Sequence, residues 1–68
     1  MSDMKILLGD LMYKKKLTIR QVSVLTGIPK STLEDIISGK RSPRMDMMEK
    51  LAAGLHVRIE ELYDSEYK

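Results

Sequence analysis

The residues best placed for chemistry are four polar side chains in the segment 30–38, namely Lys30, Ser31, Thr32 and Asp35. They lie between apolar positions of the segment and are free to meet another molecule. An ammonium group and two hydroxyls donate hydrogen bonds, and the hydroxyls and a carboxylate accept them. The sequence places no nucleophile, base and orienting group together, so catalysis has little support. The polar set is therefore suited to non-covalent recognition.

The segment 30–38 is the second of two short helices that the sequence predicts around a tight turn. Thr18 and Gln21 form a T-x-x-Q capping box that starts the first of them. Gly27 ends that helix, because glycine enters the left-handed conformation without steric cost, and Gly39 ends the second. Two helices around such a turn are the layout of a helix-turn-helix, which presents its second helix to the major groove of DNA.

Length and composition exclude several classes of protein. We expect one domain, residues 1–68, near the lower size limit for folding without disulfides or metals. There is no cysteine, and the single histidine, His56, cannot make a metal site by itself. No apolar run approaches the ~20 residues of a membrane span, and the N-terminus lacks a signal peptide. We therefore expect no enzyme activity, metal, cofactor, small-molecule ligand or membrane partner, and a cytoplasmic location, because a chain without disulfides suits a reducing compartment.

Charge is unevenly distributed along the chain. Residues 1–44 hold nine Lys/Arg and four Asp/Glu, a balance of +5, whereas residues 45–68 hold three and six, a balance of −3, which together give the net +2. The basic half contains the predicted helix-turn-helix, and its field would point toward a polyanion. Small soluble domains often carry such asymmetry by chance, so the motif decides the interpretation and the charge supports it.

The spacing of apolar residues predicts three further helices, at about residues 4–15, 45–55 and 58–62, with residues 63–68 fraying. The fold class is then all-α, a compact bundle of five short helices. We expect a common core of Leu11, Val22, Leu25, Leu33, Ile36, Leu51 and Leu55, with Met4, Ile37 and Met45 also on the buried faces of their helices.

Residues 8–62 resemble the phage repressor and Cro type of helix-turn-helix, in its small stand-alone bacterial form. The residues that carry the resemblance are Leu17-Thr18, Gln21-Val22, Gly27-Ile28, Ser31-Thr32-Leu33, Gly39-Lys40, Pro43, Leu51-Ala52, Leu55, Val57 and Glu61-Leu62. The resemblance implies a lambda-repressor-like DNA-binding domain. It also implies a homodimeric transcriptional regulator, most often a repressor, that binds double-stranded DNA at two-fold symmetric half-sites.

The resemblance also implies which residues contact DNA. The positions that read bases in the family are occupied here by Lys30, Ser31, Thr32 and Asp35. The positions that contact phosphates are occupied by Thr18, Lys40, Arg41 and Arg44. We expect the dimer surface in the C-terminal part of the chain, at Val57, Ile59, Tyr63 and Tyr67.

This chain departs from the family pattern at several positions. Ile19 replaces a glutamine that touches the DNA backbone, and Pro29 replaces a serine that caps the recognition helix. Asp35 would repel phosphate unless it accepts from cytosine or pairs with a lysine. Met12 and Ile37 stand where many members bury an arginine and a glutamate, so we expect these two side chains to share one apolar cluster.

Two functions remain open at the level of sequence. The first is a sequence-specific DNA-binding regulator that inserts the helix 30–38 into the major groove. The alternative is an antitoxin-like or anti-regulator module whose main surface binds another protein, an interpretation favoured by Ile19 and Asp35. A DNA-binding assay discriminates between them.

Overall fold

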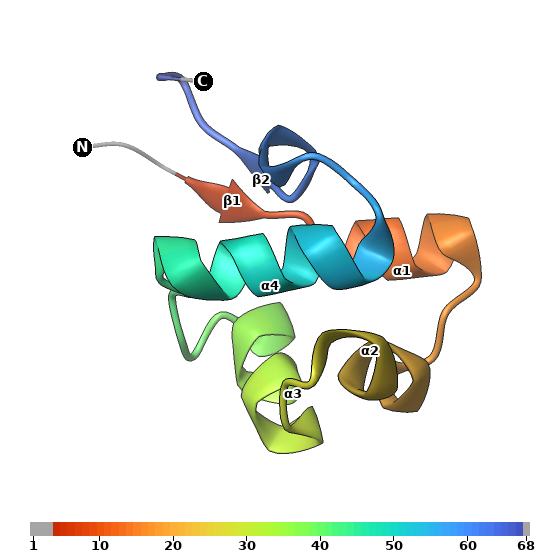
Figure 1. Ribbon diagram of the computed structural model, residues 1–68. Coiled ribbons are helices and arrows are strands. Elements are labelled where there is room, and N and C mark those ends of the chain that lie inside the picture. The colour runs from red at the N-terminus through yellow and green to blue at the C-terminus, as the bar shows by residue number, and fades with distance from the viewer. Residues whose placement is uncertain (1–3, 68) are drawn as a thin grey trace.

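The computed structural model describes residues 4–67 and is built mainly from four α-helices (Figure 1). They are α1 (Leu8–Lys15), α2 (Ile19–Thr26), α3 (Lys30–Ser38) and α4 (Met45–Leu55). A 3-10 helix, η1 (Ile59–Glu61), and two short strands, β1 (Lys5–Ile6) and β2 (Tyr63–Asp64), complete the described part of the chain. No helix within these residues combines the length and the apolar character needed to cross a membrane.

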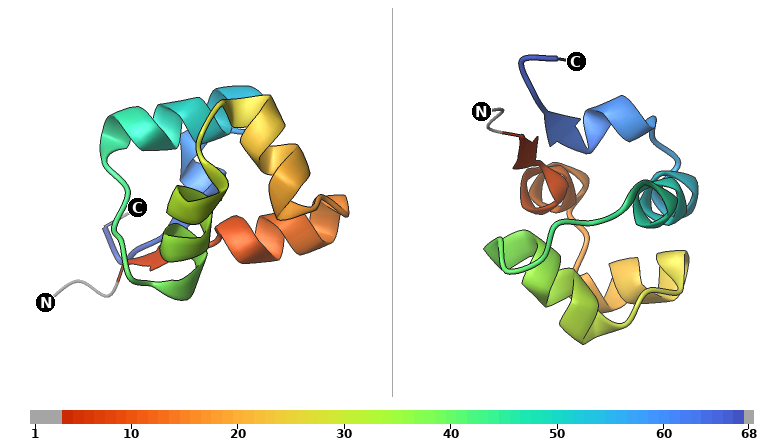
Figure 2. Two further views of the ribbon diagram at one scale, coloured as in Figure 1. Left: turned by 90° about the horizontal axis from the view of Figure 1, so that it is seen from below. Right: turned by 90° about the vertical axis from the view of Figure 1, so that its left-hand side faces the viewer.

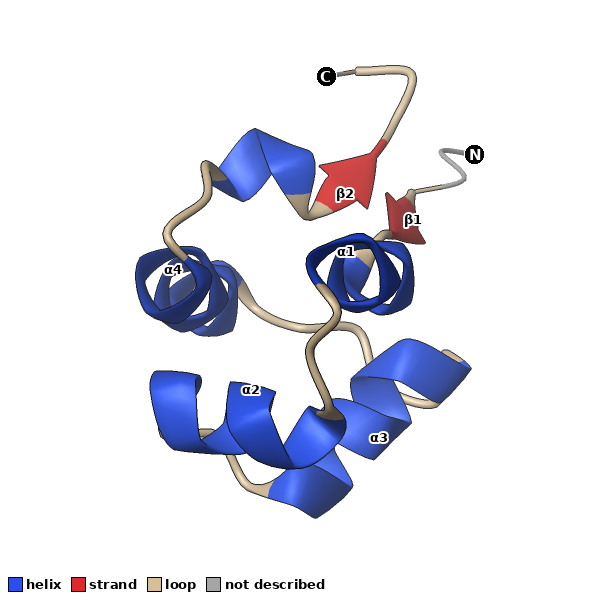
Figure 3. Cartoon of the chain, turned by 90° about the vertical axis from the view of Figure 1, so that its right-hand side faces the viewer, coloured by secondary structure: helices blue, strands red, loops and turns tan. Residues whose placement is uncertain are grey.

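The elements form three layers, which Figure 3 and the right-hand view of Figure 2 show from opposite sides. Helices α2 and α3 form one outer layer, and α1 and α4 occupy the middle. The two strands and η1 lie on the far side of that middle layer (Figure 3). The helix-turn-helix and the ends of the described chain are therefore on opposite sides of the molecule.

Local sequence signals set the ends of the helices. The Thr18 hydroxyl accepts from the Gln21 amide at 3.1 Å, and the Gln21 side chain accepts from the Thr18 amide at 2.7 Å, which confirms the capping box. Gly27 and Gly39 end α2 and α3 with φ of 75° and 87°. Helix α4 ends at Leu55, and His56 takes the left-handed conformation with φ of 56°.

The buried core lies between the layers and draws on every α-helix. Its members are Leu8, Met12, Val22, Ile28, Leu33, Ile36, Met48, Leu51, Ala52, Leu55 and Leu62. Five of the seven expected core residues are among them, and Leu11 packs against them from a half-buried position. The prediction that Leu25 belongs to the core is wrong, because its side chain is 50% exposed. Met4 and Met45 are likewise exposed, since each lies at or before the start of an element, where the helical stripe no longer faces the core.

The bundle has four α-helices rather than five helices, because both ends of the chain are organised differently from the prediction. Lys5 pairs with Asp64 and Ile6 with Tyr63 in an antiparallel ladder, and the Leu7 amide donates to the Leu62 carbonyl at 2.8 Å. Helix α1 therefore begins at Leu8 and not near residue 4. The predicted fifth helix is the single 3-10 turn η1, and the tail expected to fray is paired at Tyr63–Asp64. Lys68 lies outside the described residues.

The prediction that Met12 and Ile37 share one apolar cluster is also wrong. Met12 belongs to the buried core, whereas Ile37 is 42% exposed and does not. A Cβ built on Gly9 would lie 3.5 Å from the Ile37 Cγ2 atom, so Ile37 lies over the glycine of α1. The missing side chain of Gly9 lets the end of α3 approach α1 without covering Ile37.

Candidate nucleic-acid interface

Helix α3 carries the four predicted base-reading residues on the side that faces away from the core. Leu33 and Ile36 are buried on its inner side. Lys30 and Ser31 are exposed, and Thr32 and Asp35 are half-buried. Pro29 precedes the helix and gives it no side-chain cap, as its lack of a polar side chain predicts. The structure therefore brings the four residues together on one short helix, and none of them is fully buried.

Asp35 has no cationic partner within residues 4–67. The one ion pair among these residues joins Arg58 and Glu60 at 4.0 Å, on the exposed surface beside η1. Neither Lys30 nor Lys40 therefore neutralises the Asp35 carboxylate. Its two oxygens remain available to accept hydrogen bonds from a ligand.

The backbone of α3 positions the basic loop that follows it. Gly39 ends the helix in the left-handed conformation, and its amide donates to the Ile36 carbonyl at 3.3 Å. The Arg41 amide donates to the Asp35 carbonyl at 3.2 Å, which folds the chain back against the last turn of α3. Lys40 and Arg41 are thus fixed beside the polar face of the helix.

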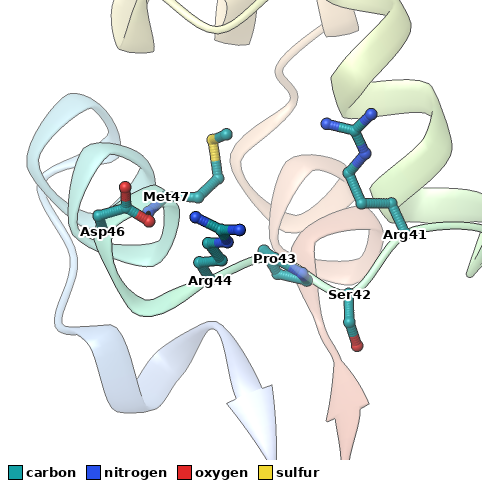
Figure 4. A pocket seen from close by; sticks show the side chains of 6 residues that line it. All are labelled: Arg41, Ser42, Pro43, Arg44, Asp46 and Met47. Atoms are coloured by element: carbon teal, nitrogen blue, oxygen red, sulfur yellow. Dashed lines mark hydrogen bonds between the residues drawn. The ribbon is translucent and has the colours of Figure 1, made fainter.

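The loop between α3 and α4 surrounds a hollow of about 440 Å³, lined by Arg41, Ser42, Pro43, Arg44, Asp46 and Met47 (Figure 4). The side chains of Arg41 and Arg44 both extend to the side of the loop away from the strands, whereas Ser42 points toward the strands (Figure 4). Lys40, Arg41 and Arg44 are all exposed, and none has an acidic partner in the described part of the chain. Three unpaired cations therefore lie on the loop between α3 and α4, with Lys40 and Arg41 close to the end of α3 and Arg44 directly before α4.

The turn between α2 and α3 is held by side chains that the sequence interpretation did not identify. The Ser23 hydroxyl donates to the Ile28 carbonyl at 2.6 Å, across the turn. The Thr26 hydroxyl donates to the Val22 carbonyl at 2.7 Å and accepts from the Ile28 amide at 3.3 Å. These bonds hold the turn between Gly27 and Pro29, and they therefore set the direction of α3 relative to α2. The sequence does contain a signal for this arrangement, namely the hydroxyls of Ser23 and Thr26 shortly before Gly27. Serine and threonine side chains bond readily to nearby backbone groups.

The start of α2 has polar groups directed to solvent. The Thr18 hydroxyl accepts a bond within the capping box, so its hydrogen is still free to donate. The exposed Gln21 uses its side-chain oxygen in the same box, which leaves its NH2 group free. Gln21 is thus a further candidate for contact with a ligand. Ile19, at the position where a glutamine is usual, packs against the core instead.

The four residues predicted for a dimer surface are not equally available. Val57, Ile59 and Tyr63 are half-buried and pack against the core of their own chain, whereas Tyr67 is 79% exposed. The apolar side chains of the segment 57–63 are therefore partly used within the chain. The dimer surface itself remains a prediction.

The comparison with protein families gives one match. The family model described as helix-turn-helix covers residues 10–62, from α1 through the capping box, α3 and the basic loop to η1. No curated protein and no solved structure gives a significant match.

Proposed function

This chain belongs to the Cro-type helix-turn-helix family of DNA-binding transcription regulators, and on that premise we propose that it is a repressor that binds its operator in a sequence-specific manner. The family match supports DNA binding, and it gives no support to a module that binds only protein. The observation that carries the proposal is the set of three exposed, unpaired cations on the loop that follows the polar helix α3. A regulator of this kind works where its DNA lies, so we place it in the cytoplasm.

In this proposal, α3 enters the major groove and its polar residues read base edges. Ser31 and Thr32 offer hydroxyls to base edges, and the threonine methyl can contact a thymine methyl. Lys30 can donate to guanine, and Asp35 can accept from the amino group of cytosine. The unpaired carboxylate supports this role for Asp35, because an acid inside the groove without a base donor would only repel phosphate.

Other residues set the position of the protein on the duplex. Lys40, Arg41 and Arg44 would contact phosphates beside α3, and Thr18 would donate to a phosphate at the start of α2. Such contacts fix register and orientation and carry no sequence information directly. Contacts of this kind require charges at fixed places. The bond from the Arg41 amide to the Asp35 carbonyl helps to hold the loop that carries them.

We further propose that two copies act together. Each chain contains one α3, and the greatest extent of the whole chain is 33 Å. Half-sites on one side of the duplex are about 34 Å apart, so a single copy cannot read both. The C-terminal surface around Tyr67 is the proposed contact between copies, because it keeps an exposed aromatic side chain.

Selection from a random duplex library, followed by polarisation titrations at several salt concentrations, tests the proposal. Lys40→Ala and Arg41→Ala should each weaken binding to all duplexes alike and lower the salt slope by about one unit. Ser31→Ala should cost about 1–3 kcal/mol on the selected site and little on unrelated duplexes. Lys50→Ala removes a charge that is also exposed, from α4, and is the matched control, with affinity and slope unchanged.

Two outcomes would contradict this function. The first is a parent protein that enriches no sequence and binds no duplex at low salt. The second is a set of loop variants that bind with the same affinity and salt slope as Lys50→Ala. In either case the family membership would stand, but the assigned interface would be wrong.

A further inference from the structure

Helix α2 carries two apolar side chains, Val24 and Leu25, that neither the core nor the proposed DNA interface uses. Leu17, Arg20, Gln21, Val24 and Leu25 line a shallow hollow of about 360 Å³, which we term the α2 face. Val24 is 79% exposed and Leu25 is 50% exposed, although both are large apolar side chains. Single apolar residues are common on protein surfaces, but several that line one hollow indicate a contact site.

The segment of chain that contains the α2 face carries charges of one sign. Between residues 11 and 33 the sequence has no Asp or Glu, and it has five cations, Lys14, Lys15, Lys16, Arg20 and Lys30. Arg20 lines the hollow itself, and Lys15 and Lys16 directly precede Leu17. None of these cations forms an ion pair within residues 4–67. A ligand that fits this surface therefore needs apolar groups for the hollow and negative charge for its rim.

DNA meets only the second of these needs. Phosphates would pair with Arg20, but a duplex backbone, with a charged phosphate between successive sugars, offers no continuous apolar surface to cover Val24 and Leu25. The basic loop also lies at the other side of the molecule from α2 (Figure 1). An amphipathic protein helix with leucines on one stripe and acids beside it meets both needs, since such helices bind shallow apolar grooves through a few anchors.

We propose that the α2 face is a docking site for an acidic amphipathic helix of a partner protein. Its leucines would cover Val24 and Leu25, and its carboxylates would pair with Arg20 and the neighbouring lysines. Docking there leaves the outward face of α3 and the basic loop free. The partner could therefore bind while the chain is on DNA, and the inference does not depend on which operator is bound.

A fluorescently labelled synthetic peptide of about 14 residues, with a leucine stripe and glutamates elsewhere, is the probe. We expect saturable binding that weakens with added salt, and no binding of the same peptide with lysine for glutamate. Val24→Asp should weaken binding about tenfold or more, since it removes an apolar contact and repels the carboxylates. Arg20→Gln should weaken it about threefold.

Met45→Asp is the matched control, because it introduces the same charge at a residue that is 62% exposed at the start of α4. It should bind the peptide as the parent does, and thermal melts should show that both aspartate variants fold. Equal peptide binding by Val24→Asp and Met45→Asp, or no binding by the parent, would overturn the proposal. So would loss of duplex binding in Val24→Asp, which would assign the face to DNA. Self-association of the parent that Val24→Asp abolishes would assign the face to a second copy.

Discussion

Replacing Gly54 with alanine should destabilise the fold, although alanine favours helices more than glycine does. A Cβ at this position of α4 would lie 2.7 Å from the Leu25 carbonyl oxygen and from the Thr26 Cγ2 atom, and 2.9 Å from the Thr26 Cα atom. Optimal separations between such atoms are about 3.5–4.0 Å, so the end of α2 would have to move by roughly 0.8 Å or more. Two of the three atoms are backbone, which a rotamer change cannot relieve.

We expect Gly54→Ala to lower the free energy of unfolding by about 1–3 kcal/mol, the usual cost of overpacking. Measured by circular dichroism, the midpoint of thermal unfolding should fall by roughly 4–8 °C for each kcal/mol in a domain of this size. Because α2 carries the Thr18 cap and leads into α3, operator affinity should fall as well.

Gly9→Ala in α1 is the matched comparison. The nearest atom to its added Cβ would be Ile37 Cγ2 at 3.5 Å, an ordinary contact. This variant should gain about 0.5 kcal/mol, because alanine loses less backbone entropy on folding. If Gly54→Ala is as stable as the parent, or less damaging than Gly9→Ala, the close approach of α2 and α4 described here is wrong.

Five other substitutions, in three sets, test the core and the cap. Leu33→Ala removes a fully buried side chain from α3 and should cost about 2–5 kcal/mol in urea unfolding; a curve that overlays the parent would contradict its place in the core. Met12→Arg should unfold much of the protein by burying an unpaired charge, whereas Ile37→Glu should stay within about 1 kcal/mol of the parent; equal losses would show that Ile37 is buried after all. Thr18→Ala should cost about 1 kcal/mol and Thr18→Ser much less, because serine keeps the capping oxygen; equal melting temperatures for the two would argue against the capping bonds.

The features that the sequence predicted correctly depend on neighbours within a few residues. The capping box of Thr18 and Gln21 and the helix ends at Gly27 and Gly39 are of this kind. So is the outward placement of Lys30 and Ser31, which follows from the buried positions of the same helix. Each of these signals acts over one or two helical turns, so no distant partner is needed to interpret it.

The features that the sequence did not predict depend on distant partners. The spacing of Met4, Leu7 and Leu8 indicated a helix, but residues 5–6 pair with residues 63–64 from the other end of the chain. Helical periodicity also identifies an apolar stripe without showing how far the neighbouring helix covers it. For that reason Leu25 and Ile37 were assigned to the core, although α4 and α1 leave both of them exposed.

The pairing of β1 with β2 has a consequence for how this domain can be rebuilt. It brings the beginning and the end of the described chain together, on the side of the molecule away from α3 (Figure 1). A polypeptide fused to either end would leave from that side of the molecule and would not cover α3. Neighbouring ends also tolerate being joined by a short linker, with new ends opened in an exposed loop. We therefore expect the fold to tolerate circular permutation, or insertion into a loop of another protein, with α3 still exposed.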